Sequence, residues 1–148
     1  MKKFFRRKRY GITAYSKRDV LDQVCYDLLY GLPENAKISK KITLYCGIHN
    51  NLFPLFYIGR GIKVGIQTEP LFDENNNIFR RATSWRAIKN INIALKKCDH
   101  ILDMNEANSS FYMHHPLKHK VTCGPHFFPH EPQPHRSGKK VVYYLLER

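Results

Sequence analysis

The fold is decided by two apolar stretches that each end in a polar cluster: Lys41–Asn50 (Lys-Ile-Thr-Leu-Tyr-Cys-Gly-Ile-His-Asn) and Ile62–Pro70 (Ile-Lys-Val-Gly-Ile-Gln-Thr-Glu-Pro). Their first parts, Lys41–Cys46 and Ile62–Gln67, are rich in apolar and β-branched residues, which predicts two buried strands. Residues 51–61 between them have the length of a short crossover helix. Strands joined by a crossover run parallel, so this region predicts an α/β sheet.

The sequence on both sides continues the alternation of strands and helices. Apolar residues at helical spacing predict a helix over about 17–30, opened by a capping box at Ser16 and Asp19, and a second helix over about 83–97. We therefore expect a Rossmann-like α/β domain, with a mostly parallel sheet covered by helices. The remaining expected elements are strands over Tyr10–Tyr15, His100–Met104, Lys120–Cys123 and Lys139–Leu146, and a brief helix over Asn108–His114.

Length and composition indicate a single globular domain. The chain has 148 residues, 43% of them hydrophobic, and it holds no apolar run long enough for a transmembrane helix or a secretory signal. Its four scattered cysteines form no C-x-x-C pair, which indicates buried, reduced thiols and a cytoplasmic protein. We expect a basic arm over 1–9, the α/β domain over 10–130, and a linker with a terminal strand over 131–148. An unpaired terminal strand favours a homo-oligomer.

Positive charge is concentrated at the N-terminus. The chain carries 25 Lys+Arg against 12 Asp+Glu, a formal charge of +13, and residues 1–9 contain cations but no acidic residue. Three interpretations stay open: a solvated arm, a nucleic-acid contact, or a contact with an anionic membrane surface that makes the protein peripheral. The cations concerned are Lys2, Lys3, Arg6, Arg7, Lys8 and Arg9.

Polar clusters follow most of the predicted strands. Because parallel strands present their carboxyl ends at one edge of a sheet, these clusters are expected to meet there and to form a ligand site. Gly47 is expected to leave room for a ligand to approach the backbone. The residues predicted to line one concave edge are Gly47, His49, Gln67, Glu69, Asn105 and His126.

Each side chain in these clusters has more than one interpretation. His49 is either a general base or a surface loop histidine. Glu69 either binds hydroxyls or shares proton transfer with His49, or else it is a strand-terminal carboxylate paired with one of the many Arg or Lys residues. Asn105, Glu106 and Asn108 either bind hydroxyls or cap the next helix, and capping is favoured. The other expected ligand contacts are Asn50, Thr68 and Gly124.

The remaining chemistry-bearing residues indicate no metal or cofactor. His114, His115, His119 and the later histidines lie near Cys123, but their spacing matches no standard zinc module. Nucleotide-binding glycine loops and nucleophile elbows are missing from the sequence. The helical spacing of Trp85 and Ile88 favours a core tryptophan over a stacking platform.

Taken together, the clusters resemble the N-terminal, acceptor-side half of a GT-B-type glycosyltransferase of the capsule or spore type. The resemblance runs from about Lys41 to Arg148, through Cys46–Asn50, Val64–Leu71, Cys98–Asp103 with the following Asn105–Asn108, Lys120–Phe127 and Val141–Arg148. It implies a domain that binds a sugar or glycan acceptor at the strand carboxyl ends, with His49 and Glu69 as catalytic residues. Transfer from a sugar nucleotide would then need a separate C-terminal partner domain. The alternative is a non-enzymatic basic module that binds nucleic acid.

Overall fold

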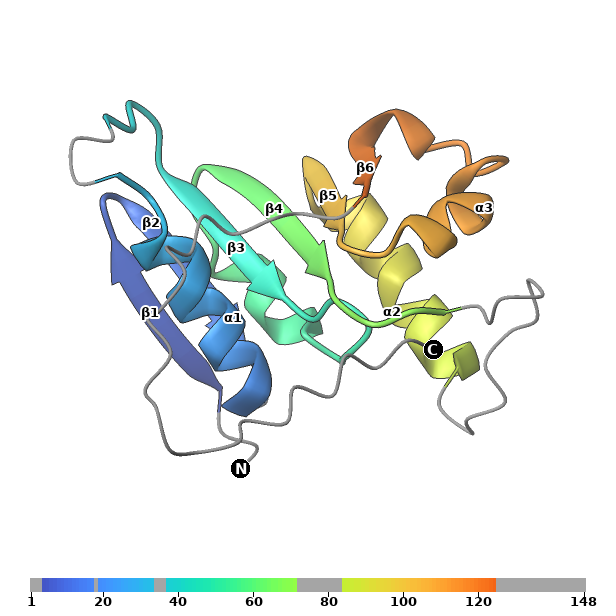
Figure 1. The fold of residues 1–148 in the computed structure, drawn as a ribbon, viewed down its shortest axis with the longest axis horizontal. Coiled ribbons are helices and arrows are strands. Elements are labelled where there is room, and N and C mark those ends of the chain that lie inside the picture. Colours follow the sequence, from blue (N-terminus) through green and yellow to red (C-terminus); the bar gives the residue numbers. More distant parts are fainter. Residues whose placement is uncertain (1–3, 18, 34–36, 72–83, 125–148) are drawn as a thin grey trace, which may run out of the picture.

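The computed structural model describes residues 4–17, 19–33, 37–71 and 84–124. They form a six-stranded sheet in which the strands follow one another in chain order (Figure 1). The first pair, β1 and β2, is antiparallel, and every later pair is parallel. The strands are β1 (Phe5–Arg9), β2 (Ile12–Ser16), β3 (Ile42–Cys46), β4 (Ile62–Gln67), β5 (His100–Asp103) and β6 (Val121–Cys123).

Two longer helices cover the sheet, and short helical turns fill the connections. The predicted α/β domain with a mostly parallel sheet and covering helices is confirmed, whereas the predicted linker and strand over 131–148 lie outside the described residues. None of the described helices has the length and apolarity needed to cross a membrane. The helices are α1 (Asp19–Tyr30), η1 (Phe53–Tyr57), α2 (Ser84–Lys97), η2 (Glu106–Asn108), α3 (Ser109–Tyr112) and η3 (Lys118–Lys120).

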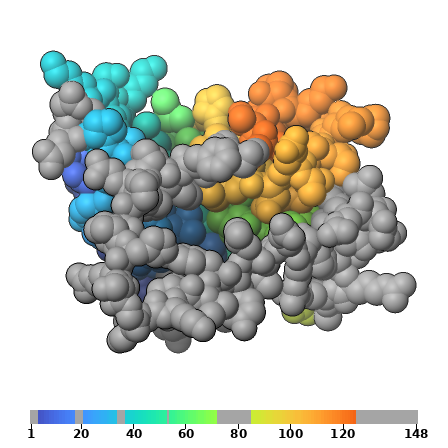
Figure 2. Space-filling model, in the orientation of Figure 1, coloured from blue at the N-terminus to red at the C-terminus, as the bar shows by residue number. Residues whose placement is uncertain are grey.

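The two faces of the sheet have separate apolar cores. Successive residues of a strand point to opposite faces, so neighbouring residues of β3 enter different cores. Cys46 packs with Cys25 of α1, while Tyr45 packs with Ile91 of α2. Helix α1 therefore covers one face over β1–β3, and α2 covers the other over β4 and β5. In the space-filling view, the orange segment after β5 forms a continuous surface at one end of the molecule (Figure 2).

The connection that follows β2 and the connection that follows β3 lie on opposite faces of the sheet. Helix α1, which follows β2, lies on one face, whereas Leu55 and Phe56 of η1, which follows β3, belong to the core on the face of α2. Among the described strands the order does not reverse, which differs from the doubly wound Rossmann order. Open α/β sheets bind ligands outside the carboxyl ends of their parallel strands, which here are the ends of β2–β6.

The basic N-terminal segment is part of the sheet. We expected a separate arm over 1–9, and this was wrong for Phe5–Arg9, which pair with β2 as strand β1. Tyr10 and Gly11 have φ values of 51° and 82°, and two successive positive values produce the tight turn typical of two-residue hairpins. Strand β2 consequently begins at Ile12 and not at Tyr10.

Two further expectations were wrong. Ser16 is the last residue of β2, and its buried hydroxyl has no hydrogen-bond partner among the described residues, so it caps no helix. Trp85 is 60% exposed, and the Arg86 guanidinium lies 5.3 Å from the centre of its ring. A three-residue spacing drifts by about 60° per step around a helix, which carries Trp85 away from the buried stripe at Ile91 and Leu95.

The cysteines agree with the sequence analysis. Cys25, Cys46 and Cys98 are buried, Cys123 is half-buried, and all four are free thiols. Burial raises the pKa of the Cys98 thiol to about 12. Cys25, Cys46 and Cys98 are therefore part of the core, and Cys123 packs against it.

Candidate functional site

A glycine turn directs the chain from β3 toward β4. Gly47 has a φ of 76°, and the amides of Gly47 and Ile48 both donate to the carbonyl of Ile66, at 2.8 and 3.1 Å. A Cβ on Gly47 would lie 2.3 Å from Cδ1 of Leu21 in α1. The glycine is therefore required by the turn and by the packing of Leu21, which corrects the expectation that it leaves room for a ligand.

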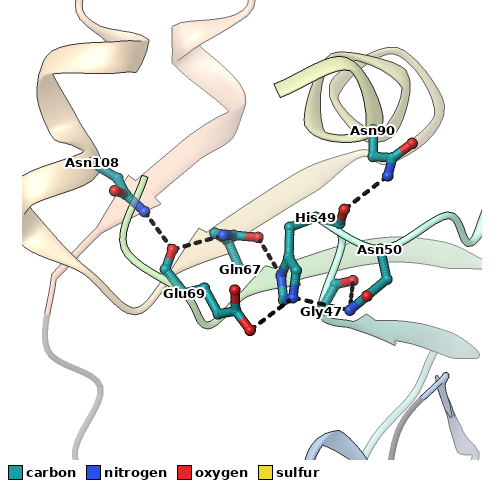
Figure 3. Close-up of polar contacts among 7 residues, drawn as sticks. All are labelled: Gly47, His49, Asn50, Gln67, Glu69, Asn90 and Asn108. Carbon is teal, nitrogen blue, oxygen red and sulfur yellow. Dashed lines mark hydrogen bonds and ion pairs between the residues drawn. The ribbon is translucent and has the colours of Figure 1, made fainter. Parts of the chain in front are cut away.

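The side chain of Gln67 fixes the tautomer of His49. Nδ1 of His49 lies 3.1 Å from Oε1 of Gln67, the last residue of β4 (Figure 3). Nε2 of Gln67 donates to the carbonyl of Glu69 at 2.7 Å, so the amide orientation of Gln67 is determined and its Oε1 is an acceptor. Nδ1 of His49 must then carry the hydrogen, and the lone pair of the neutral ring is on Nε2.

Two side chains of different chemistry meet Nε2 of His49. Nδ2 of Asn50 is 3.0 Å away and donates to the neutral ring, while Oε1 of Glu69 is 3.3 Å away and pairs with the protonated ring (Figure 3). The imidazole is only 8% exposed, whereas the Glu69 side chain is 56% exposed. The pair can therefore accept a proton at Nε2 and stabilise the resulting charge with a carboxylate that faces solvent.

Helix α2 holds the backbone of the same turn. Nδ2 of Asn90 donates to the carbonyl of His49 at 2.8 Å, across a sequence separation of 41 residues (Figure 3). Within the turn, the amide of Asn50 donates to the carbonyl of Gly47 at 2.9 Å. The position of His49 is thus set by β3, β4 and α2 together.

Asn108 joins the Glu69 segment to the end of β5. Its Nδ2 donates to the carbonyl of Glu69 at 3.1 Å and to both carboxylate oxygens of Asp103 at 3.0 Å. Its Oδ1 accepts the amide of Leu71 at 2.8 Å. Asn108 is fully buried and makes no side-chain cap, which corrects the expectation of a capping residue. It positions Glu69 against His49.

The buried carboxylate of Asp103 anchors this connection. Besides Asn108, it accepts the hydroxyl of Tyr112 at 2.8 Å and the amide of Asn105 at 2.9 Å. Burial raises the pKa of Asp103 above its ordinary value of 3.8, although its hydrogen bonds act in the opposite direction. Burial and the nearby Asp103 carboxylate also raise the pKa of Tyr112 strongly, so that phenol remains a donor.

The structure brings most of the predicted site residues to one edge. His49, Asn50, Gln67 and Glu69 are in direct contact, and Asn108 reaches them through the Glu69 carbonyl.

The other predicted site residues are not part of these contacts. Thr68 Oγ1 and Asn105 Nδ2 are buried without hydrogen-bond partners among the described residues. Asn105 makes no side-chain cap either. Glu106 is exposed, the Gly124 amide donates to the Asp103 carbonyl at 3.0 Å, and His126 lies outside the described residues.

Three residues that hold the site were not predicted. Asp103 lies next to the end of the predicted strand His100–Met104, a position that could have marked it, but Asn90 and Tyr112 have no distinguishing sequence signal. Within the described ranges, no three His, Cys, Asp or Glu side chains gather closely enough to hold a metal ion.

Comparisons of this chain with protein-family models, with curated proteins and with solved structures find no match.

Proposed function

We propose that this chain is the acceptor-binding domain of a GT-B-type glycosyltransferase, which binds a sugar or glycan at the carboxyl ends of β3–β5. The observation that carries the proposal is the contact between His49 and Glu69, in which Gln67 leaves the lone pair of the neutral imidazole on Nε2. A histidine with this tautomer and a carboxylate partner is suited to general-base catalysis near neutral pH. The motifs of Cys46–Asn50 and Val64–Leu71, which resemble that family, surround the same two side chains.

The proposed reaction is glycosyl transfer to an acceptor hydroxyl. The hydroxyl replaces the Asn50 amide at Nε2 of His49 and gives its proton to that nitrogen. Its oxygen forms a bond to the anomeric carbon of a sugar nucleotide while the bond from that carbon to the nucleoside diphosphate breaks, and the diphosphate leaves with the electron pair. Glu69 stabilises the imidazolium. The sugar nucleotide is supplied by a separate donor-binding domain.

Two polar atoms that follow neighbouring strand ends lack hydrogen-bond partners among the described residues, and this supports a ligand rich in hydroxyl groups. Thr68 Oγ1 and Asn105 Nδ2 follow the ends of β4 and β5, and neither has a partner within the described part of the chain. Unsatisfied buried polar atoms are rare and costly in folded proteins, and they are often completed by water or a ligand. Sugar hydroxyls both donate and accept, so they suit a hydroxyl and an amide nitrogen equally.

Sugar titrations followed by amide NMR test this proposal. Glucose, galactose, N-acetylglucosamine and their oligosaccharides serve as probes. At least one is expected to give saturable shifts at residues 47–50 and 67–71, and Glu69→Gln is expected to weaken binding about tenfold, the effect of losing one charged hydrogen bond. His49→Ala is expected to weaken it similarly.

The matched control is Asp27→Asn, which removes a carboxylate from α1, on the other face of the sheet, and is expected to leave binding unchanged. Saturable binding that Glu69→Gln and His49→Ala do not alter would contradict the proposed site. The same holds if none of the sugars binds.

A further inference from the structure

The cations of β1 divide into two sets by strand alternation. Arg7 and Arg9 are half-buried on the face of α1, because they lie opposite Ala14 and Ile12 of β2, which belong to the α1 core. Arg6 and Lys8 are exposed on the other face, opposite Tyr15 and Thr13. The two sets of cations therefore lie in different surroundings, and each set needs its own explanation.

Arg7 attaches β1 to α1. Its Nε and Nη2 donate to the two carboxylate oxygens of Asp22 at 2.8 and 2.7 Å, a two-pronged contact that raises the pKa of the guanidinium. The same guanidinium lies 5.1 Å from the centre of the Tyr26 ring. Arg7 is thus engaged within the fold.

Arg9 extends the attachment through an aromatic stack. Its guanidinium lies 4.3 Å from the ring centre of Tyr30 and 4.5 Å from that of Tyr10, and Nη2 donates to the Tyr10 hydroxyl at 2.8 Å. Tyr30 stacks in turn on Tyr26, with ring centres 4.2 Å apart. Arg7, Tyr26, Tyr30, Arg9 and Tyr10 form a continuous series of ring and guanidinium contacts.

Arg6 and Lys8 remain as the solvent-facing charges of the edge strand. Neither forms an ion pair within the described residues, where the pairs are Arg7–Asp22 and His49–Glu69. They stand two residues apart, about 7 Å along the strand. Lys2 and Lys3 precede them in the sequence, and no acidic residue occurs before Asp19.

We propose that the edge of β1, through Arg6 and Lys8, docks on an anionic lipid surface. Uncompensated cations along a straight edge match a surface whose negative charge is spread and not placed at defined points. Tyr26 and Tyr30 of α1 contact Arg7 and Arg9 on the other face of the sheet, so the proposed surface binds through its cations and not through aromatic side chains.

The aromatic stack argues against single-stranded nucleic acid as the partner. Proteins that bind single strands offer free ring faces on which bases stack. Here the rings of Tyr26 and Tyr30 are stacked on each other, and guanidinium groups lie over both. Phe4 likewise packs against the core on the α2 face. The edge offers charge without a stacking platform.

Vesicle co-sedimentation of the full chain tests the proposal. The protein is expected to bind vesicles of phosphatidylcholine with phosphatidylglycerol, but not phosphatidylcholine alone, and salt is expected to weaken binding. Arg6→Ala with Lys8→Ala should weaken binding about 30-fold, the effect of two interfacial cations. Arg6→Lys with Lys8→Arg, which keeps both charges, should retain vesicle binding.

Lys89→Ala with Lys96→Ala, which removes the same charge from exposed positions of α2, is the matched control and should bind as the wild type does.

Three results would overturn the docking surface. An equal loss of vesicle binding in the α2 control would show that net charge alone is responsible. Absence of binding to anionic vesicles would leave Arg6 and Lys8 as charges that only prevent strand pairing at the edge. Binding of a fluorescent single-stranded RNA that depends on Arg6 and Lys8, without vesicle binding, would assign the edge to nucleic acid. Arg7 and Arg9 stay unchanged in all variants, so we expect the variants to keep the thermal stability of the wild type. Thermal unfolding of each variant checks this.

Discussion

The carboxyl edge of β3–β5 and the outer edge of β1 are both rich in polar residues, but they are organised in opposite ways. At the carboxyl edge, His49 and Asn108 each contact several polar groups from other elements. At the β1 edge, half of the cations are engaged in this way, and Arg6 and Lys8 face solvent. Residue type along a segment therefore does not reveal its function, whereas the partners of each side chain do.

The largest expected effect on the free energy of unfolding is at Asn108, which joins the end of β5 to the Glu69 segment. Asn108→Ala leaves the Leu71 amide and part of the Asp103 carboxylate unsatisfied in a buried place, so the free energy of unfolding should fall by about 3 kcal/mol. Urea unfolding measures this loss. Asn105→Ala is the matched control and should cost less than about 1 kcal/mol, because its side-chain nitrogen makes no hydrogen bond. Equal losses of unfolding free energy in the two variants would show that the hydrogen bonds of Asn108 do not stabilise the fold.

A smaller effect is expected at the β1 edge. Arg9→Ala removes contacts with Tyr10 and Tyr30 that are partly exposed, so it should lower the free energy of unfolding by about 1–2 kcal/mol. Lys8→Ala, on the adjacent and exposed position, should change it by less than about 0.5 kcal/mol. Thermal unfolding of the two variants compares them directly. Similar losses would mean that the two sets of cations are not distinct.

The smallest effect is a pH dependence at Asp103. Its pKa in the folded protein is raised by burial, so the folded protein binds this proton more tightly than the unfolded chain does. The carboxyl therefore stabilises the fold below its ordinary value of 3.8, and this contribution is lost as the pH rises through the raised pKa. Asp103→Asn removes the dependence, so its destabilisation relative to the wild type should grow as the pH falls toward 4. A constant difference across that range would contradict the raised pKa.

Much of the fold was predictable because its elements follow simple local patterns. The apolar, β-branched runs of Ile42–Cys46 and Ile62–Gln67 are the central strands, and the periodic stripes gave α1 and α2 within a few residues. The meeting of His49 and Glu69 was predictable as well, since parallel strands present their carboxyl ends at one edge. These predictions need only strand direction and periodicity.

The errors arose where tertiary contacts decide. Asn108 resembles a capping residue in sequence, and only the placement of Asp103 and Glu69 beside it makes it a buried connector. The basic segment resembles a flexible arm, but Asp22 and Tyr30 of α1 provide partners that hold it as a strand. In both cases the deciding partners are distant in sequence, so local pattern could not identify them.

The central claim, that Gln67 leaves the lone pair of His49 on Nε2, is tested most directly by the ring nitrogen signals. A long-range ¹H–¹⁵N correlation spectrum above the titration range of the ring should show His49 protonated at Nδ1 and unprotonated at Nε2. Gln67→Leu with Asn50→Ala, which removes both the acceptor at Nδ1 and the donor at Nε2, should leave a mixture of both tautomers, whereas Asp27→Asn should not alter the preference. A wild-type spectrum with the hydrogen on Nε2, or with both tautomers in exchange, would contradict the account.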